Sequence, residues 1–436
     1  MRGSVAVLIL ACMGCGRFGF DSNPEEPPAP DGPVADTVRI TVSHNGGDGT
    51  VTGPNGFTCT GGECTLDVAP GTAVNLRGLA ATDAWFAGWT GPCGGNFDCD
   101  LQVDADVTVI ADFTPTPNRV FITSTTTAGD FGGIAGADAI CATRAAAAGL
   151  SGTFIAYLSD SATAAPSRIS TSRGWIRTDG APFADAPTGF SSGSLLFPVR
   201  LDEYGNDLGA AQAWVGTNYG AITNANLCTN WTSAEAAQNG TTNMLEFGFD
   251  MPQSRVRACS QQHGLLCVEI GRVVTVATRP DTGKRAFVTL NGWQPGGGRT
   301  SADAHCASEA ALAGLSGSFL AAVATTTESI KSRFPSDQIY RRTDDVRLLR
   351  GPGMFTTDWL DIAPELDQFG DIVSNDFWTG AQRFDAVPTA AENCNDWTDN
   401  SDVMSGAMHF TTSTHVAAPF KVDPCELAVP LLCLEK

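Results

Sequence analysis

The stretch GLSGTF at Gly149–Phe154 decides the fold, because the chain contains it a second time, as GLSGSF at Gly314–Phe319. Each stretch begins eight residues after a cysteine, Cys141 in one case and Cys306 in the other. A shared motif in fixed register with a cysteine is typical of an internal duplication. We therefore expect two structurally equivalent copies, the first and the second copy, to make up most of the chain.

Three further cysteines follow in the same register in each copy. The gaps between successive cysteines are 87, 31 and 8 residues in the first copy and 88, 31 and 8 in the second. A Cys-x-x-Trp-Thr motif recurs with them, as does a closing Leu-Leu-Cys-x-Glu motif. Spacing alone allows three pairings of four cysteines within each copy. The cysteines concerned are Cys141, Cys228, Cys259, Cys267, Cys306, Cys394, Cys425 and Cys433.

The residues around each glycine-rich stretch predict the same local structure. Small and apolar residues at helical spacing precede it, and Gly149 or Gly314 stands where a helix would end. Apolar runs on either side are typical of buried strands. We expect a strand, a helix and a strand in each copy, at residues 119–124, 137–148 and 154–158, and at residues 285–290, 302–313 and 319–323.

These features resemble the collagen-derived endostatin family, which has a C-type-lectin-like fold, and its bacterial relatives. The resemblance covers residues 118–270 and 284–436, joined by a linker at 271–283, or about 70 per cent of the chain. It implies an α+β fold class, with two tandem endostatin-like domains. It also implies nested disulfides, first to fourth and second to third cysteine: Cys141–Cys267, Cys228–Cys259, Cys306–Cys433 and Cys394–Cys425.

The chain departs from this family at its ligand sites. Both copies are net acidic and lack the arginine-rich face with which endostatin binds heparin, and neither has the histidines of its zinc site near the domain start. The calcium-dependent sugar signatures Glu-Pro-Asn and Trp-Asn-Asp of related lectin folds are also missing. A local basic cluster, interrupted by acidic residues, is interpreted as a solvated loop: Arg341, Arg342, Arg347 and Arg350.

Residues 37–115 have a different pattern. Alternating apolar residues at 38–42 and 107–113 predict strands, and the Phe-Ala-Gly-Trp element at 86–89 resembles divergent bacterial repeats related to internalin B repeats. We expect a small all-β module that precedes the two copies. Two local staples, Cys59–Cys64 and Cys93–Cys99, are the simplest pairing of its cysteines, and a four-cysteine zinc site is the competing hypothesis.

The N-terminus predicts export. Residues 1–15 combine one positive charge with a short apolar run and two lipobox-like cysteines, which indicates a lipoprotein signal peptide. Cys15 is the expected lipidation site and Cys12 the alternative. Residues 16–36 form a proline-rich acidic linker that would hold the domains away from a membrane. We expect a bacterial outer membrane lipoprotein, facing the surface or the periplasm.

Composition argues against several functions. A net charge of −21 disfavours nucleic acid and other polyanions. The five histidines show no metal-binding spacing, and no nucleophile elbow, phosphate loop or dinucleotide fingerprint is present. We therefore expect no catalytic residue, no metal and no cofactor. The acidic pairs Asp202-Glu203 and Asp344-Asp345 are interpreted as solvated surface, and His409 and His415 as loop residues.

Three residues are candidates for ligand binding, because a carboxylate beside an aromatic ring suits sugar recognition: Asp376, Trp378 and Asp396. Their neighbouring tryptophans recur in both copies, so a core role is the preferred interpretation of the rings. The leading hypothesis is a lipid-anchored protein that binds an extracellular protein or glycan. The alternatives are a structural envelope lipoprotein without a ligand and, third, a carbohydrate-active enzyme.

Overall fold

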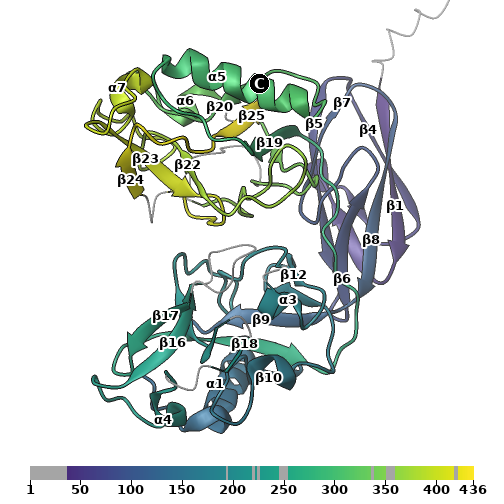
Figure 1. The fold of residues 1–436 in the computed structure, drawn as a ribbon. Helices are drawn as coiled ribbons and strands as arrows, with labels where there is room; N and C mark the ends of the chain where they lie inside the picture. Colours follow the sequence, from purple (N-terminus) through teal and green to yellow (C-terminus); the bar gives the residue numbers. More distant parts are fainter. Residues whose placement is uncertain are drawn as a thin grey trace, which may run out of the picture. The chain divides into compact units, whose positions relative to one another are not determined.

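The computed structural model describes residues 37–192, 195–218, 221–222, 226–244, 254–334, 338–349, 359–416 and 421–436. It is a mixed α+β protein with many strands, few short helices and several separate sheets (Figure 1). The expected signal peptide with Cys12 and Cys15, the linker at 16–36, and Arg350 lie outside these residues. Within the described ranges, no helix is both long and apolar enough to cross a membrane.

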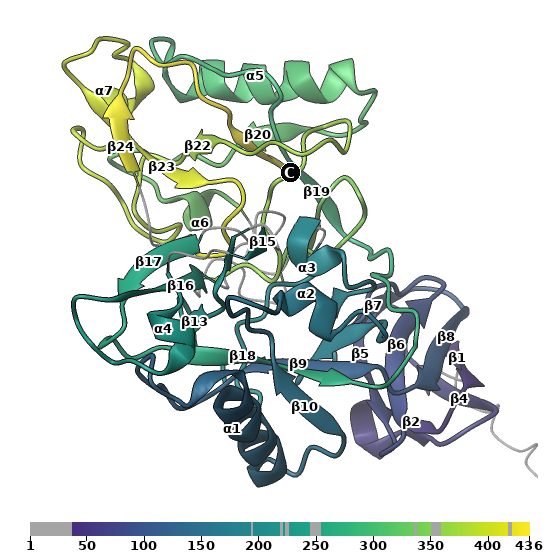
Figure 2. The same ribbon diagram turned by 60° about the horizontal axis from the view of Figure 1, so that its bottom comes forward.

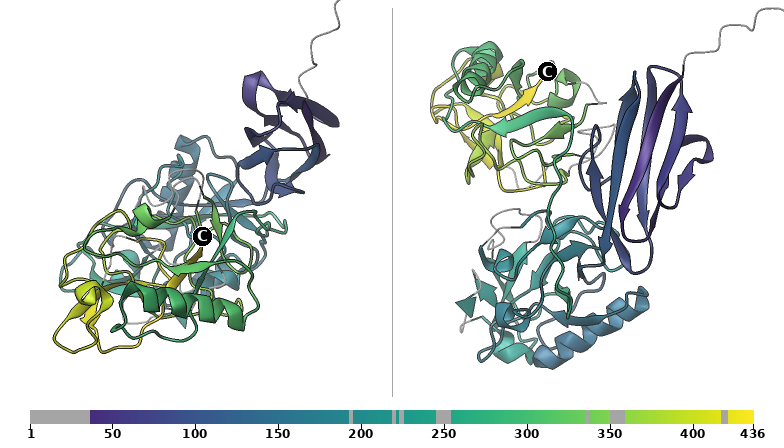
Figure 3. Two further views of the ribbon diagram at one scale, coloured as in Figure 1. Left: turned by 90° about the horizontal axis from the view of Figure 1, so that it is seen from above. Right: turned by 90° about the vertical axis from the view of Figure 1, so that its right-hand side faces the viewer.

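Residues 37–115 form two four-stranded sheets, as the alternating pattern predicts. Their strand orders are β4-β1-β8-β6 and β3-β2-β5-β7. Buried residues from both sheets, among them Ile40, Val74 and Val109, form one core, so the sheets pack face to face (Figure 3). The strands are β1 (Val38–Gly46), β2 (Gly49–Thr52), β3 (Thr58–Cys59), β4 (Glu63–Val68), β5 (Thr72–Ala80), β6 (Ala84–Thr90), β7 (Cys99–Val103) and β8 (Val107–Pro115).

The first copy is built on one twisted sheet, in the order β12-β11-β9-β18-β13-β16-β17, with β10 also paired to β18. Helix α1 (Gly133–Ala147) lies beside β10 and β18 (Figure 2), and Gly149 ends it with φ +72°. The strands are β9 (Asn118–Ile122), β10 (Thr153–Ala156), β11 (Trp175–Arg177), β12 (Pro182–Ala184), β13 (Gln212–Trp214), β16 (Asn239–Met244), β17 (Ser254–Ala258) and β18 (Gly264–Ile270), with a small β14 (Thr217–Asn218) and β15 (Ala221–Ile222) pair.

The second copy repeats these elements in two sheets, β20-β25-β19-β21 and β22-β23-β24. Helix α5 (Gly298–Leu312) lies along β20 and β25 (Figure 1) and ends before Gly314, which has φ +68°. The expected helix and strands are therefore present in both copies. The strands are β19 (Lys284–Val288), β20 (Phe319–Ala321), β21 (Tyr340–Arg341), β22 (Asp376–Trp378), β23 (Ser405–Phe410), β24 (Lys421–Pro424) and β25 (Leu432–Glu435).

Six disulfides cross-link the described part of the chain, and their pairing agrees with the expected one throughout: Cys59–Cys64, Cys93–Cys99, Cys141–Cys267, Cys228–Cys259, Cys306–Cys433 and Cys394–Cys425. The outer bridge of each copy joins its helix to the closing strand, β18 or β25. Disulfides persist in oxidising compartments. Their number therefore indicates an extracytoplasmic location.

Short helices complete the two copies. The first copy has α2 (Ala165–Arg168), α3 (Gly189–Ser192) and α4 (Cys228–Trp231). The second copy has α6 (Ile330–Arg333) and α7 (Cys394–Trp397). Among these, α2 matches α6 and α4 matches α7 in the repeat register, so the functional comparison below rests on equivalent positions.

Candidate functional site

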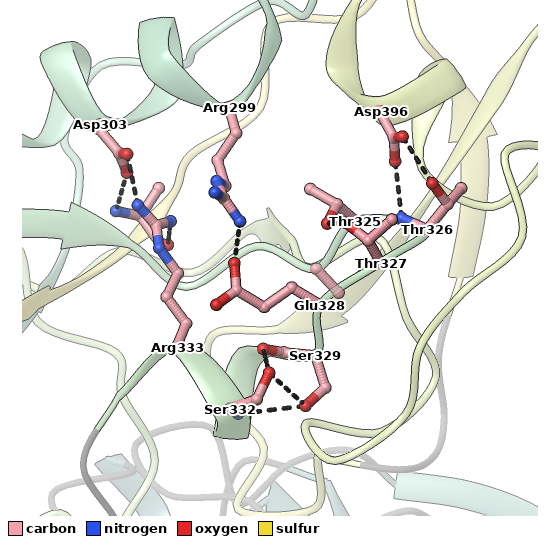
Figure 4. A network of polar contacts seen from close by, with 12 residues as sticks. Arg299, Asp303, Thr325, Thr326, Thr327, Glu328, Ser329, Ser332, Arg333 and Asp396 are labelled. Carbon is pink, nitrogen blue, oxygen red and sulfur yellow. Dashed lines mark hydrogen bonds and ion pairs between the residues drawn. The ribbon is translucent and has the colours of Figure 1, made fainter.

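An ion pair holds the long helix of each copy against the strand that follows it. In the second copy Arg333 pairs with Asp303 of α5 and donates a hydrogen bond to the Ala321 carbonyl at 2.6 Å (Figure 4). Asp303 also accepts from the Ala321 amide at 3.0 Å. In the first copy Arg168 and Asp138 form the same pair at 2.6 Å. Because both copies contain the pair, we assign it to the structure that the two copies share.

The two Cys-x-x-Trp motifs, α4 and α7, are single left-handed turns rather than right-handed helices, because all four residues of each have positive φ. The values are 51° to 67° at Cys394–Trp397 and 47° to 65° at Cys228–Trp231. Left-handed backbone costs about 1–2 kcal/mol for each residue that is not glycine. The disulfide at the first residue and the fully buried tryptophan at the last one stabilise the turn against this cost.

Asp396 lies inside the second of these turns and fastens it to a neighbouring loop (Figure 4). Its carboxylate accepts hydrogen bonds from the amide and hydroxyl of Thr326, both at 2.7 Å, and from the Asn393 amide group at 2.8 Å. Partial burial raises the pKa of Asp396, but these hydrogen bonds outweigh it and leave the pKa below its ordinary value.

The first copy makes the same connection with a neutral side chain. Asn230, the counterpart of Asp396, accepts from the Ser161 amide and donates to the Ser161 hydroxyl, both at 2.9 Å. An amide in the first copy and a carboxylate in the second therefore make equivalent hydrogen bonds at this position. The contacts of Asp396 are structural, because they join the turn to the neighbouring loop.

A charged pair beside the Asp396 turn distinguishes the second copy. Arg299 of α5 forms an ion pair with Glu328, and each side chain is 35% exposed (Figure 4). The equivalent residues of the first copy are Ile134 and Thr163. These two positions are thus charged in the second copy and uncharged in the first, as expected for a surface outside the structure that the two copies share.

Asp376 lies on β22 and pairs across the sheet with Lys421, at 3.4 Å. Lys421 in turn pairs with Asp423 at 2.6 Å. Burial raises the pKa of Asp376 above its ordinary value, and the nearby Lys421 ammonium offsets this only in part. Among the described residues, Asp376 and Asp396 share no hydrogen-bonding partner.

Trp378 offers no ring face to a ligand, because it is fully buried. Its indole N–H donates to the Trp293 carbonyl at 3.3 Å, and its ring packs edge-on against Trp397 with centroids 5.9 Å apart. Trp214, Trp231 and Trp397 are also fully buried. The preferred core interpretation is confirmed, and Trp378 as a sugar-stacking residue is wrong in this structure.

The interpretation of Asp202-Glu203 as solvated surface is wrong. Both residues are 2% exposed. Glu203 forms an ion pair with Arg144 of α1 and accepts from the Ser124 hydroxyl at 2.7 Å. Asp202 accepts from two backbone amides of its own turn. Both carboxylates are buried because these donors replace the water they would otherwise bind.

Two other surface assignments also fail. Arg342 and Arg347 are 7% and 4% exposed, and each pairs with a buried carboxylate, Glu365 and Asp281 respectively, so these two members of the basic cluster are not solvated. His409 lies in β23 and is 1% exposed, since both faces of that strand are covered. Burial lowers the pKa of His409 to about 4.

An exposed aromatic residue stands at the tip of the same turn in both copies. Tyr204 is 54% exposed and Phe369 55% exposed. In the first copy Asp202 accepts from the Tyr204 and Asn206 amides at 2.9 and 2.8 Å. We call Asp202–Asn206 and Asp367–Asp371 the aromatic turns.

The aromatic turn of the second copy has the same internal contacts. Asp367 accepts from the Phe369 and Asp371 amides at 2.8 and 2.9 Å. Gly370 supplies the left-handed residue with φ +90°. Thr343 fastens the turn from outside by donating to the Asp367 carbonyl at 2.9 Å. Each aromatic side chain is thus presented to solvent on a preorganised backbone.

The surroundings of the two aromatic turns differ. In the first copy Arg144 lies over the Tyr204 ring, 5.7 Å from its centroid. In the second copy three apolar residues are exposed instead, Leu290 at 54%, Phe369 at 55% and Ile372 at 41%. Their counterparts in the first copy are Ser124, Tyr204 and Asp207. The surroundings of Tyr204 are therefore charged, whereas those of Phe369 are apolar.

The sequence contained a signal for these turns that the cysteine register alone does not reveal. Asp202 and Asp367, Tyr204 and Phe369, and Gly205 and Gly370 are each separated by 165 residues. An Asp-x-aromatic-Gly repeat predicts a tight turn. The exposure of the rings, however, depends on packing and is seen only in the structure.

No family model matches this chain, and no curated protein matches its sequence. Across the described residues, no group of three or more His, Cys, Asp or Glu side chains is arranged to hold a metal ion.

Proposed function

We propose that this chain is an exported binding protein that recognises an extracellular protein or glycan through two endostatin-like domains of the C-type-lectin fold. The observation that carries the proposal is the pair of exposed rings, Tyr204 and Phe369, on equivalent preorganised turns. Large exposed aromatic side chains are enriched at binding hot spots. Both rings are retained in the two copies, whereas neighbouring residues have diverged. This retention supports a role in recognition.

Two such turns on one chain favour multivalent binding. A second binding event on the same chain is intramolecular, which raises apparent affinity without new contacts. The different surroundings of the turns suit two ligands, or two parts of one ligand. A purely structural envelope protein gives no reason to expose a ring twice at the same position.

The proposal is tested with the full, disulfide-bonded chain on glycan and extracellular-matrix protein arrays. We expect binding that falls at least tenfold in the Tyr204→Ala, Phe369→Ala double variant. Val256→Ala and Val403→Ala, which remove residues 54% and 83% exposed elsewhere, are the matched controls and should bind normally. No binding on either array, or equal binding by the double variant, would refute the proposed role of the turns.

We also propose that Cys15, or alternatively Cys12, is lipid-modified and anchors the protein in the outer membrane. The lipobox-like sequence before each cysteine supports this. Metabolic labelling with a fatty acid tests it: label should be lost in Cys15→Ser and kept in Cys12→Ser. Label that disappears only in Cys12→Ser would move the anchor to that residue.

A further inference from the structure

A cleft of about 670 Å³ lies between the N-terminal sheets and the first copy. Small-molecule sites in proteins typically have volumes of about 300–1,000 Å³. The indole N–H of Trp85, on β6, donates to the Gly180 carbonyl at 2.9 Å and closes one side of the cleft. Neither Tyr204 nor Phe369 lines it, so it is separate from the aromatic turns.

The carboxylates that line the cleft all have partners. Asp98 pairs with Arg77 at 3.8 Å, and Asp100 accepts from the Asn75 amide group at 2.8 Å. Asp179 pairs with Arg177 at 2.6 Å. Arginines therefore offset the negative charges of Asp98 and Asp179, whereas the neutral partner of Asp100 does not offset its charge.

Arg119 is the exception among the charged groups of the cleft, because its guanidinium has no hydrogen-bond or ion-pair partner among the described residues. Its counterpart in the second copy, Arg285, pairs with Glu435 at 3.1 Å. In the first copy the equivalent carboxylate, Glu269, pairs instead with Arg272 at 2.9 Å. Arg272 thus takes over the structural contact and leaves Arg119 to line the cleft.

An arginine without a partner in a cleft selects a particular ligand chemistry. Its planar guanidinium binds a carboxylate through two parallel hydrogen bonds. The Asn75 amide group and the Thr178 hydroxyl also line the cleft, and each already donates a hydrogen bond within the chain, to Asp100 and to the Asp202 carbonyl. Their oxygens can still accept hydrogen bonds, which suits a ring bearing hydroxyl groups better than an apolar molecule. The acidity of the whole chain disfavours a ligand with many negative charges.

We propose that this cleft binds a saccharide that carries a single carboxylate, with Arg119 as the residue that pairs with the carboxylate. The inference deepens the proposed binding function by adding a second site with a defined ligand class. It predicts that affinity depends on the acid group and that added salt weakens binding, since the pair is partly exposed.

The experiment is calorimetric titration of the full, disulfide-bonded chain with two probes, a disaccharide ending in glucuronic acid and the matching disaccharide ending in glucose. We expect the acidic probe to bind and the neutral one to bind at least tenfold more weakly. Arg119→Gln should weaken the acidic probe by roughly tenfold or more, because a hydrogen bond to a charged group is lost. Arg255→Gln, an exposed arginine on β17, is the matched control and should leave affinity unchanged.

Thermal unfolding of both variants checks that neither disturbs the fold. Equal affinity for the two probes, or normal binding of the acidic probe by Arg119→Gln, would overturn the proposal. Failure of both probes to bind would also overturn it. Array binding that still depends on Tyr204 and Phe369 would show that the proposed function stands without this cleft.

Discussion

Gln368 donates a hydrogen bond to the buried carboxylate of Glu309 at 2.7 Å. At the same two positions the first copy has Glu203 and Arg144, which form an ion pair. The contact between the helix and the aromatic turn is therefore kept, while its acidic partner has moved from the turn to the helix. Such an exchange is expected where each copy must satisfy a buried polar pair.

Gln368→Glu should therefore destabilise the second copy. It places a second carboxylate against Glu309, and both positions are 3% exposed. We expect a loss of about 2–4 kcal/mol, measured by denaturant unfolding of the oxidised chain at pH 7. The Gln368→Glu, Glu309→Arg double variant recreates the pair of the first copy and should recover most of the loss. Exposed Gln294→Glu is the control; an equal effect there would contradict the explanation.

The outer disulfide of each copy should contribute more stability than the inner one. Cys306 and Cys433 are separated by 127 residues, whereas Cys394 and Cys425 are separated by 31. In the chain-entropy model the two bridges are worth about 4.9 and about 3.7 kcal/mol. Unfolding midpoints of the two paired Cys→Ala variants measure the difference. A larger loss without the inner bridge would indicate that native-state strain or packing decides the order.

The elements that the sequence predicted correctly depend on local signals. The helix of each copy follows from residues at helical spacing and ends before Gly149 or Gly314, whose positive φ a larger side chain resists. The nested pairing of the disulfides does not follow from the shared register, which allows three pairings in each copy; it is what the resemblance to the endostatin family implies.

The buried charges could not be predicted in this way. Arg144 and Glu203 are 59 residues apart, and Arg347 and Asp281 are 66 residues apart. A charged residue is normally exposed unless it is paired, and these pairs exist only once the chain has folded. The exposed rings of Tyr204 and Phe369 were missed for the converse reason, since their sequence gives no sign that the core leaves them outside.

Acidification should destabilise the chain through His409. Burial lowers its pKa to about 4, whereas an unfolded histidine has a pKa of about 6.5. The unfolded state therefore binds a proton first, so stability is complete above about pH 6.5 and falls between there and about pH 4. The loss from this group is up to roughly 3 kcal/mol.

Unfolding free energies of His409→Gln across this pH range test the assignment. Glutamine keeps a donor for the Ala381 carbonyl, which His409 contacts at 3.3 Å, but does not titrate. Its stability should therefore fall less between pH 6.5 and 4 than that of the parent chain. His305→Gln, on the partly exposed side of α5, is the control. A slope unchanged in His409→Gln would assign the acid sensitivity to other groups.

Gly370, in the aromatic turn of the second copy, should be required only because of the backbone conformation at that position. Gly370 has φ +90°, and a methyl group added there would meet only the Thr343 hydroxyl, at 3.9 Å. Gly370→Ala should therefore cost about 1–2 kcal/mol through left-handed strain rather than through a clash. The Phe369 and Asp371 amide hydrogens should also exchange faster in the variant, because in the parent chain both are hydrogen-bonded to Asp367.

Denaturant unfolding and hydrogen exchange followed by mass spectrometry measure these two effects. Gly47→Ala is the matched control, since Gly47 lacks a positive φ and its added methyl would make ordinary contacts at 3.6 Å or more. We expect that control to stay within about 0.5 kcal/mol of the parent chain. If Gly370→Ala behaved like the control, the turn would not be preorganised, and the rigid display of Phe369 on which the proposed binding role depends would lose its basis.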